Sequence, residues 1–380
     1  MSKDRARILI VLLILAGGLL LKPSAACAQD TLHVKSWFRE MVQMIPPKIP
    51  RDSIRIVVIG DVMMHSAQLG RDYSPFLEDL KPMLSGADIA IANMEFPLGG
   101  KPYTGYPAFS TPDDYADYIA GLGTDVFLTA NNHVMDKGVA GLEKTLKKYA
   151  GMEGVKFTGA SFKDVADSTI NPLIINAKGV RIALINFTYG MNYGLPPEDS
   201  GASVRLMKKE DTEELFQRAR RSKADFIIAL PHWGEEYSLK HNSAQEKYAR
   251  WLAESGADII IGSHPHVVQD TCIMKTSDGR RVPVVYSLGN AVSNMSAINT
   301  RLELAATVTL VRDFLGQISF HGIRLDFMWC TLPGMLIDNY KTVLVKDRTG
   351  QRDRWIRAAD YDNMISTLER VKNKTGIDKN

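Results

Sequence analysis

The segment Gly262–His266 carries two imidazoles one residue apart, directly after a short aliphatic run. Alternate residues of an extended chain project to the same side, so the side chains of His264 and His266 are expected to converge on one point. Imidazole is the commonest side-chain metal ligand near neutral pH. A single His-x-His segment more often belongs to a polar loop, so a metal site here requires ligands from other segments.

Ligand-type side chains also follow other short aliphatic runs of the chain. They are Asp61, Glu95, Asn132 with His133, His232, His264 with His266, and Asn290. Each has a simple structural explanation by itself; Asp61, for example, could cap a helix. In open α/β sheets, however, ligands bind outside the carboxyl ends of the strands. The recurrence of such side chains therefore predicts a metal site at one edge of a sheet.

The chemistry of this ligand set narrows the metal and the reaction. Two carboxylates, several imidazoles and an amide oxygen suit a divalent cation such as Zn²⁺, Mn²⁺ or Fe²⁺, whereas Mg²⁺ and Ca²⁺ prefer fewer imidazoles. The ligands outnumber those of one tetrahedral ion and fit two ions that share a carboxylate. A two-metal centre holds a hydroxide at neutral pH and stabilises both the attacking and the leaving oxygen, which predicts hydrolysis.

The elements that must position these residues are short strands alternating with helices. Aliphatic runs bounded by Gly, Pro or polar residues predict strands at 54–59, 88–92, 125–129, 181–185, 225–230, 258–261 and 282–286. Apolar residues at helical spacing predict helices within 142–149, 214–221 and 245–255. This alternation indicates an α/β fold with largely parallel strands. Residues 302–311 and 317–327 read as paired strands, and a polar helix is expected near 361–373.

The N-terminus predicts export. Three basic residues precede the apolar run Ile8–Leu21, and Ala26-Cys27-Ala28 offers a cleavage site, so residues 1–28 read as a signal peptide. An uncleaved N-terminal anchor and a lipoprotein acylated at Cys27 are the alternatives. Residues 29–53 are a lead-in segment. The expected location is the periplasm or the cell envelope of a bacterium.

Composition and cysteine content restrict the remaining possibilities. The formal net charge of +3 over 380 residues is too small to indicate a nucleic-acid partner. After cleavage only Cys272 and Cys330 remain. An oxidising compartment would let them pair, but buried free thiols are the simpler expectation. The single glycine after the first strand, Gly60, does not form a nucleotide-binding loop, which needs several.

Six motifs in order carry a family resemblance. They are Gly60–Met63, Asn93–Pro97, Ala130–Gly138, His232–Tyr237, Gly262–His266 and Tyr286–Asn290. The series resembles the CapA family of capsule and poly-γ-glutamate biosynthesis, which has a calcineurin-like metallophosphoesterase fold. This resemblance implies a four-layer αββα sandwich with two mixed β-sheets over residues 54–295. Residues 296–330 would add strands to the same domain, and 331–380 would form a C-terminal extension.

The resemblance also implies roles for individual residues. Asp61, Glu95 and His266 would hold one metal ion, and Glu95 would bridge to a second ion held by Asn132, His232 and His264. His133 would act at the substrate as a general acid or as a contact to the scissile group. Asp136 would either orient His133 or cap the following helix.

Two positions depart from metallophosphoesterases at large. Their first motif has a histidine where this chain has Met63, and their second has an aspartate where this chain has Glu95. The first ion thereby loses a ligand, so a single bound ion is expected on the His264 side. His65 could compensate, but the sequence does not give its direction.

Two functions follow from the resemblance. One is a metal-dependent hydrolase that acts on an anionic cell-surface polymer, poly-γ-glutamate or a capsule-like material, by phosphoester or γ-glutamyl amide cleavage. The other is a non-catalytic polymer-binding or export and assembly factor that works with membrane-bound components of a capsule synthase.

Overall fold

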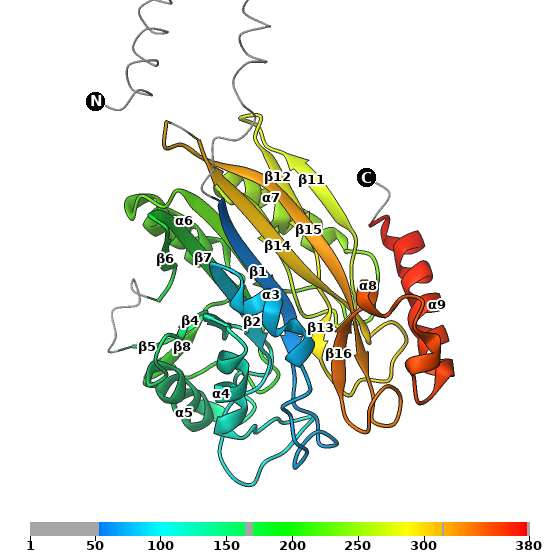
Figure 1. Cartoon of the computed structure of the whole chain (residues 1–380). Coiled ribbons are helices and arrows are strands. Elements are labelled where there is room, and N and C mark those ends of the chain that lie inside the picture. The colour runs from blue at the N-terminus through cyan, green and yellow to red at the C-terminus, as the bar shows by residue number, and fades with distance from the viewer. Residues whose placement is uncertain (1–52, 164–169, 314, 378–380) are drawn as a thin grey trace, which may run out of the picture. The chain divides into compact units, whose positions relative to one another are not determined.

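The computed structural model describes residues 53–163, 170–313 and 315–377 (Figure 1). The predicted signal peptide and the lead-in segment lie outside these residues, except for Ser53, which begins the first strand. All seven runs predicted to be strands are strands: β1 (Ser53–Val62), β2 (Ile89–Met94), β3 (Val126–Leu128), β7 (Val180–Thr188), β9 (Phe226–His232), β10 (Ile259–Ile261) and β12 (Arg281–Val285).

The other strands complete the two large sheets or form a small separate pair. They are β4 (Lys156–Thr158), β5 (Ala160–Phe162), β6 (Leu173–Ala177), β8 (Ala202–Val204), β11 (Thr271–Lys275), β13 (Asn290–Val292), β14 (Leu302–Arg312), β15 (Ile318–Thr331) and β16 (Lys341–Leu344). One sheet has the order β16-β15-β14-β1-β2-β3-β4 with β13 paired to β1, and a second has the order β11-β12-β10-β9-β7-β6. Strands β5 and β8 form a small separate pair.

Both large sheets combine parallel and antiparallel strands. In the first, β1 to β4 are parallel and β14 to β16 are antiparallel. In the second, β7, β9, β10 and β12 are parallel, and β6 and β11 are antiparallel edges. The prediction of two mixed sheets is therefore confirmed.

The helices flank these sheets. They are η1 (Glu78–Leu80), α3 (Lys81–Ser85), α4 (Asp113–Gly121), α5 (Gly138–Ala150), α6 (Lys209–Arg221), α7 (Ser243–Ser255), α8 (Val345–Arg348), η3 (Arg352–Arg354) and α9 (Ala358–Thr375). The three helices predicted from apolar spacing correspond to α5, α6 and α7, and the predicted polar helix corresponds to α9.

Strand β1 shows why four layers form. Its side chains alternate between two cores: Ile56 and Val58 pack between the two sheets, whereas Val57 and Ile59 pack against α4 and α5. A strand buried on both faces requires a continuous aliphatic run, which is the pattern of residues 56–59. Helices α6 and α7 cover the outer face of the second sheet around Ile185. The αββα arrangement is therefore confirmed (Figure 1).

Helix α9 is fastened to the first sheet by one buried ion pair. The guanidinium of Arg301 donates to both carboxylate oxygens of Asp360 at 2.6 and 2.7 Å, and the indole Nε1 of Trp329 donates to the same carboxylate at 3.2 Å. The side chains of Arg301 and Asp360 are only 11% and 5% exposed.

Replacing Asp360 by alanine is expected to lower the free energy of unfolding by about 3 kcal/mol, because a buried guanidinium loses its counterion. Urea unfolding would measure this change. The control is Asp362→Ala. Asp362 also lies in α9, and its exposed ion pair with Arg352 should contribute little, so this variant should leave stability nearly unchanged. Equal effects of the two variants would contradict a structural role for the buried pair.

The cysteines and the possible membrane-spanning helices can be assessed in the described residues. Cys272 in β11 and Cys330 in β15 are free thiols in different sheets, as expected; Cys330 is buried, whereas Cys272 is only half-buried. Within the described ranges, no helix combines the length and the apolar character that a bilayer span requires.

Candidate metal centre

The predicted ligands come from both large sheets, not from one sheet edge as the sequence suggested. Asp61 lies in β1, while Glu95 and Asn132 follow β2 and β3 of the first sheet. His232 ends β9 of the second sheet, and His264 and His266 follow β10. The composition of a strand does not reveal which other strands share its sheet. That the carboxyl ends of strands from two sheets meet at this site could therefore not be predicted from composition.

Two glycines allow the backbone to close around this region. A Cβ atom on Gly60 would lie 1.9 Å from the carbonyl oxygen of Gly289, and one on Gly262 would lie 2.2 Å from that of Tyr286. Any side chain at either position would push apart strands that carry candidate ligands. The glycine before Asp61 is therefore needed to bring β1 against the start of β13.

The carboxylate of Asp61 is fully buried and held by three neighbours. Its Oδ1 accepts from the amide of Asn93 at 2.7 Å, and its Oδ2 accepts from the backbone N–H of His264 at 3.1 Å. The same Oδ2 lies 3.6 Å from Nδ1 of His266. Burial raises the pKa of Asp61, so the ionised form needs a nearby cation.

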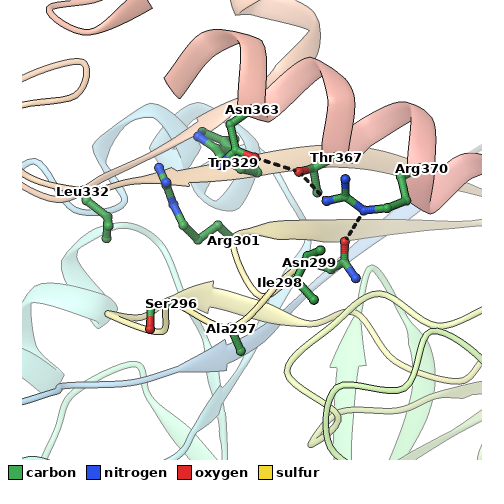
Figure 2. Close-up of a pocket in the computed structure, with 10 residues that line it drawn as sticks. All are labelled: Ser296, Ala297, Ile298, Asn299, Arg301, Trp329, Leu332, Asn363, Thr367 and Arg370. Carbon is green, nitrogen blue, oxygen red and sulfur yellow. Dashed lines mark hydrogen bonds between the residues drawn. The ribbon is translucent and has the colours of Figure 1, made fainter. Parts of the chain in front are cut away.

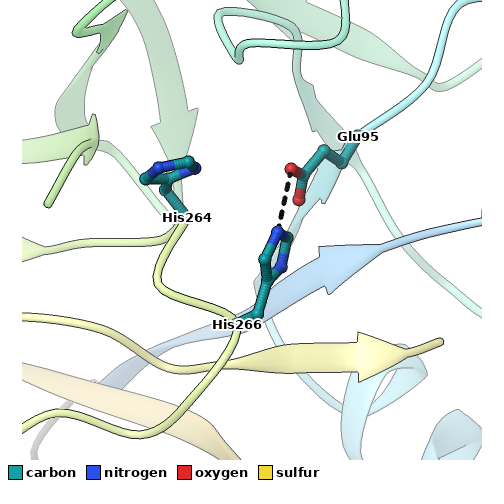
Figure 3. Close-up of side chains that lie close together, drawn as sticks. All are labelled: Glu95, His264 and His266. Carbon is teal, nitrogen blue, oxygen red and sulfur yellow. Dashed lines mark ion pairs between the residues drawn. The ribbon is translucent and has the colours of Figure 1, made fainter. Parts of the chain in front are cut away.

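Glu95 is the most informative side chain of the cluster. It is fully buried, and neither carboxylate oxygen has a hydrogen-bond partner among the described residues. Its Oε1 lies 3.7 Å from Nε2 of His232 and 3.8 Å from Nε2 of His266, which Figure 3 shows facing it. Burial, followed by the negative charge of Asp61, raises the pKa of Glu95 well above its ordinary value.

His264 and His266 converge, but not by the predicted route. Their φ angles are 100° and 57°, so both residues are in left-handed backbone conformations and do not alternate along an extended strand. The loop turns both rings toward Glu95, with 5.8 Å between ring centroids (Figure 3). The alternation argument was therefore wrong, although the expected proximity is present.

Neighbouring amides and a hydroxyl orient the imidazoles. Nδ1 of His266 donates to the side-chain oxygen of Asn290 at 2.9 Å, which leaves Nε2 as the acceptor nitrogen facing Glu95. Nδ1 of His232 lies 3.0 Å from Oγ of Ser263, and its Nε2 lies 2.7 Å from Oδ1 of Asn132. Hydrogen bonding thus fixes the ring positions before any ligand arrives.

The donor atoms fit a metal centre with a shared carboxylate. Glu95, His264 and His266 place one ligand atom each within 4.8 Å of one another, as do Asp61, Glu95 and His232. Glu95 belongs to both groups, which a bridging role requires. The two loop histidines share a group, whereas the family resemblance assigned them to different ions. Nδ1 of His264 is also buried without a hydrogen-bond partner in the described part of the chain.

The imidazoles are electrically suited to metal binding. Burial lowers the pKa of His264 to about 3 and that of His232 well below its ordinary value, with neighbouring histidines as the second cause. Both rings are therefore neutral at physiological pH and present lone pairs. Unpaired buried carboxylate oxygens beside neutral imidazoles are what a divalent cation would satisfy.

His133 and Asp136 form a separate pair beside the cluster. Nδ1 of His133 donates to Oδ2 of Asp136 at 2.7 Å, and the same oxygen accepts the backbone N–H of Phe109 at 2.8 Å. Helix α5 has Lys137 at its N-cap and no side-chain cap, so the helix-cap alternative for Asp136 is wrong. The contact with Asp136 therefore sets the orientation of the His133 ring.

Met63 lies in the first motif and His65 follows it, and neither is placed to bind a metal ion. Met63 is buried in the apolar core with α4 and α5. Nδ1 of His65 accepts the backbone N–H of Asn294 at 3.2 Å, so this nitrogen is not available to a metal. His65 also belongs to neither group of clustered ligand atoms within the described residues. His65 therefore does not take the place of the histidine that Met63 replaces.

Other residues around the centre were not predicted as part of it. The side-chain amide nitrogen of Asn93 donates to Asp61 and lies 3.3 Å from Nδ1 of His232. Asn93 could have been predicted from its position in the second motif, two residues before Glu95. The amide nitrogen of Asn192 lies 3.5 Å from both ring nitrogens of His133. Asn192 follows β7 and carried no sequence signal.

Three exposed tyrosines surround the centre. The ring centroid of Tyr106 lies 6.4 Å from that of His133, that of Tyr189 lies 4.7 Å from that of His264, and that of Tyr237 lies 6.4 Å from that of His266. Their exposed fractions are 68%, 45% and 44%, whereas the candidate ligands His232, His264 and His266 are at most 3% exposed. We call Tyr106, Tyr189 and Tyr237 the tyrosine rim. Its rings lie beside the histidines and are partly exposed to solvent.

The fold and this cluster define an α/β protein with a candidate metal centre between the carboxyl ends of two mixed sheets. The chain belongs to the family described as bacterial capsule synthesis protein PGA_cap, whose model matches residues 55–295. The family predicted from the six motifs is therefore confirmed.

Individual relatives agree with this assignment. The chain is 28% identical over 288 residues to the capsule biosynthesis protein CapA of Bacillus anthracis, covering 71% of this chain and 67% of the relative. It is 27% identical over 284 residues to the PGA biosynthesis protein CapA of Bacillus subtilis (strain 168), covering 72% of each. Among solved structures, a 5'-nucleotidase precursor from Thermus thermophilus gives a TM-score of 0.47 at 13% identity, covering 84% of this chain and 58% of that chain.

Proposed function

We propose that this protein is an exported bacterial hydrolase that uses one or two divalent metal ions to process an anionic cell-surface polymer. The family and the names of the CapA relatives support a role with capsule material or poly-γ-glutamate. The observation that carries the hydrolase proposal is Glu95, a buried carboxylate that lacks a hydrogen-bond partner in the described ranges and faces His232 and His266. Export to the periplasm or cell envelope rests on the predicted signal peptide.

The proposed ligands are the predicted ones: Asp61, Glu95, Asn132, His232, His264 and His266. Divalent Mn, Fe or Zn bound to them would acidify water and polarise the scissile group. The protein's own part is to hold these groups in place through Asn93, Ser263 and Asn290. His133 is the proposed general acid, held by Asp136, for a phosphoester or a γ-glutamyl amide.

The tyrosine rim is the proposed contact for the polymer. Aromatic faces pack on methylene groups and planar amides. Replacing Tyr106 by leucine is expected to raise KM about 2- to 10-fold with little change in kcat, because ring packing contributes about 0.5–1.5 kcal/mol. Steady-state kinetics would measure both constants. Tyr106→Phe keeps the ring and should behave like the wild type; equal defects in the two variants would contradict ring packing.

A non-catalytic polymer-binding or assembly factor is the second candidate. Met63 favours it, since this buried methionine stands where a metal-ligating histidine occurs in related phosphoesterases. Such a factor would work with membrane-bound components of a capsule synthase, and its polymer binding would persist after metal removal.

A hydrolysis panel separates the two candidates. The exported form is purified gently, its metal content is measured, and it is then assayed on phosphomonoester, phosphodiester and γ-glutamyl amide substrates. We expect bound divalent metal and cleavage of at least one substrate, both lost in the His264→Ala/His266→Ala double variant. Metal-free wild-type protein, or polymer binding without hydrolysis in every metal tested, would reject the hydrolase.

A further inference from the structure

A cavity of about 310 Å³ lies between α9, the start of β14 and the loop that follows β13 (Figure 2). Its lining residues are Ser296, Ala297, Ile298, Asn299, Arg301, Trp329, Leu332, Asn363, Thr367 and Arg370. None of them is among the proposed metal ligands. Two arginines and no acidic residue line this cavity, so its charge depends on which guanidinium is already neutralised.

Arg301 is neutralised by the fold. Two of its N–H groups donate to Asp360, and its Nε donates to the backbone oxygen of Cys330 at 2.8 Å. Its guanidinium also lies 4.4 Å from the centroid of the Trp329 ring. The positive charge of Arg301 therefore belongs to the attachment of α9.

Arg370 is held in place by neutral groups. Its Nε donates to Oδ1 of Asn299 and one of its terminal nitrogens donates to Oγ1 of Thr367, each at 2.9 Å. Thr367 in turn contacts the side chain of Asn363 at 3.3 Å, and Figure 2 shows this chain of contacts. A guanidinium has five N–H groups, so three remain. Among the described residues, no carboxylate forms an ion pair with Arg370, whereas Arg301 has one.

We propose that this cavity is a binding site for a carboxylate, with Arg370 as the anchoring cation. The remaining N–H groups of a planar guanidinium match a carboxylate in a two-point contact. The side-chain amide of Asn363 supplies a further donor, and Trp329 and Leu332 provide an apolar wall for an aliphatic stem. The one uncompensated positive charge matches a single carboxylate group, which carries one negative charge, better than a doubly charged phosphate. A second carboxylate of the same ligand would have to remain in solvent.

Two sources could supply such a carboxylate: a free small dicarboxylic acid, or a side chain of a polyanionic chain such as linked glutamates. The site does not depend on hydrolysis at the metal centre, so it remains open to test even if the protein is not an enzyme. The two sources differ in how affinity changes with ligand length.

Isothermal titration of the metal-loaded protein tests the proposal, with glutarate, a γ-linked glutamate oligomer, its uncharged amide and inorganic phosphate as probes. Arg370→Gln is expected to weaken carboxylate binding about 10- to 100-fold, the effect of losing a charged hydrogen-bond donor. Asn363→Asp should cause a similar loss, because it adds a negative charge at an exposed position that folding tolerates. Lys374→Gln is the control, since it removes a positive charge of α9 from outside the lining.

The pattern of affinities decides the outcome. Tighter binding of the oligomer than of glutarate, with both lost in Arg370→Gln, supports a polymer side chain. Equal binding of the two supports a free acid. Unchanged binding in Arg370→Gln and Asn363→Asp, or phosphate and the amide binding as tightly as the carboxylates, would overturn the proposal. Melting temperatures of all variants show whether each is folded.

Discussion

Replacing Glu95 by glutamine is expected to stabilise the metal-free protein. Both carboxylate oxygens are buried without hydrogen-bond partners in the described part of the chain, and burial raises the pKa of Glu95. The native state then binds a proton that the unfolded state has lost at neutral pH, which costs stability above the unfolded pKa. Removing this cost should raise the free energy of unfolding by about 1–3 kcal/mol at pH 7. The gain should vanish as the pH falls below about 4.

With metal present, the order of stability should reverse. A ligand that binds only the native state stabilises it, by about 2.7 kcal/mol at a concentration 100 times Kd. A neutral amide cannot bridge two cations as a carboxylate does, so the glutamine variant should lose metal and most of this gain. Urea unfolding with and without added Mn²⁺ or Zn²⁺, together with metal analysis, measures both effects.

Glu303 provides a matched control for this experiment. It is also buried with both oxygens unpartnered in the described ranges, and burial raises its pKa well above the ordinary value. It belongs to neither group of clustered ligand atoms. Glu303→Gln should therefore stabilise the protein with and without metal and leave the metal content unchanged. If the two variants respond alike to metal, Glu95 is not a ligand.

The strands and the order of the motifs could be read from the sequence because both are local properties. A strand buried on two faces must be apolar throughout, so the runs 56–59 and 226–230 can be recognised in the sequence. Asp61, Glu95 and His232 directly end or follow such runs. Their clustering follows from the rule that ligands bind at the carboxyl ends of parallel strands.

The details of the centre depend on contacts between distant segments. The left-handed conformations of His264 and His266 occur in a loop that contacts β1, where the N–H of His264 donates to Asp61. The loops that carry Tyr106 and Tyr189 contain no motif that would predict their position beside the histidines. Arg370 lies far beyond the matched motifs in the sequence, and only folding brings its helix beside Asn299.

Replacing His133 by alanine is expected to lower kcat by about 10²- to 10⁴-fold, the usual contribution of a positioned general acid or base. The metal content should not change, because His133 lies in neither ligand group of the described residues. Asp136→Asn should lower kcat less, by about 10- to 100-fold, since it disturbs only the orientation of the ring. Steady-state kinetics and metal analysis of both variants provide the measurements.

The leaving group of the substrate distinguishes the two possible roles of His133. A general acid matters most when the leaving group is basic, so His133→Ala should lose far more activity on an alkyl ester or alkyl amide than on a 4-nitrophenyl ester or 4-nitroanilide. A histidine that only contacts the scissile group should cost the same factor on both members of a pair. If His133 is the general acid, its Nε2 would deliver the proton, since Asp136 holds its Nδ1 at 2.7 Å. A loss that does not depend on the leaving group would therefore assign His133 to substrate contact, with Asp136 fixing that contact in place.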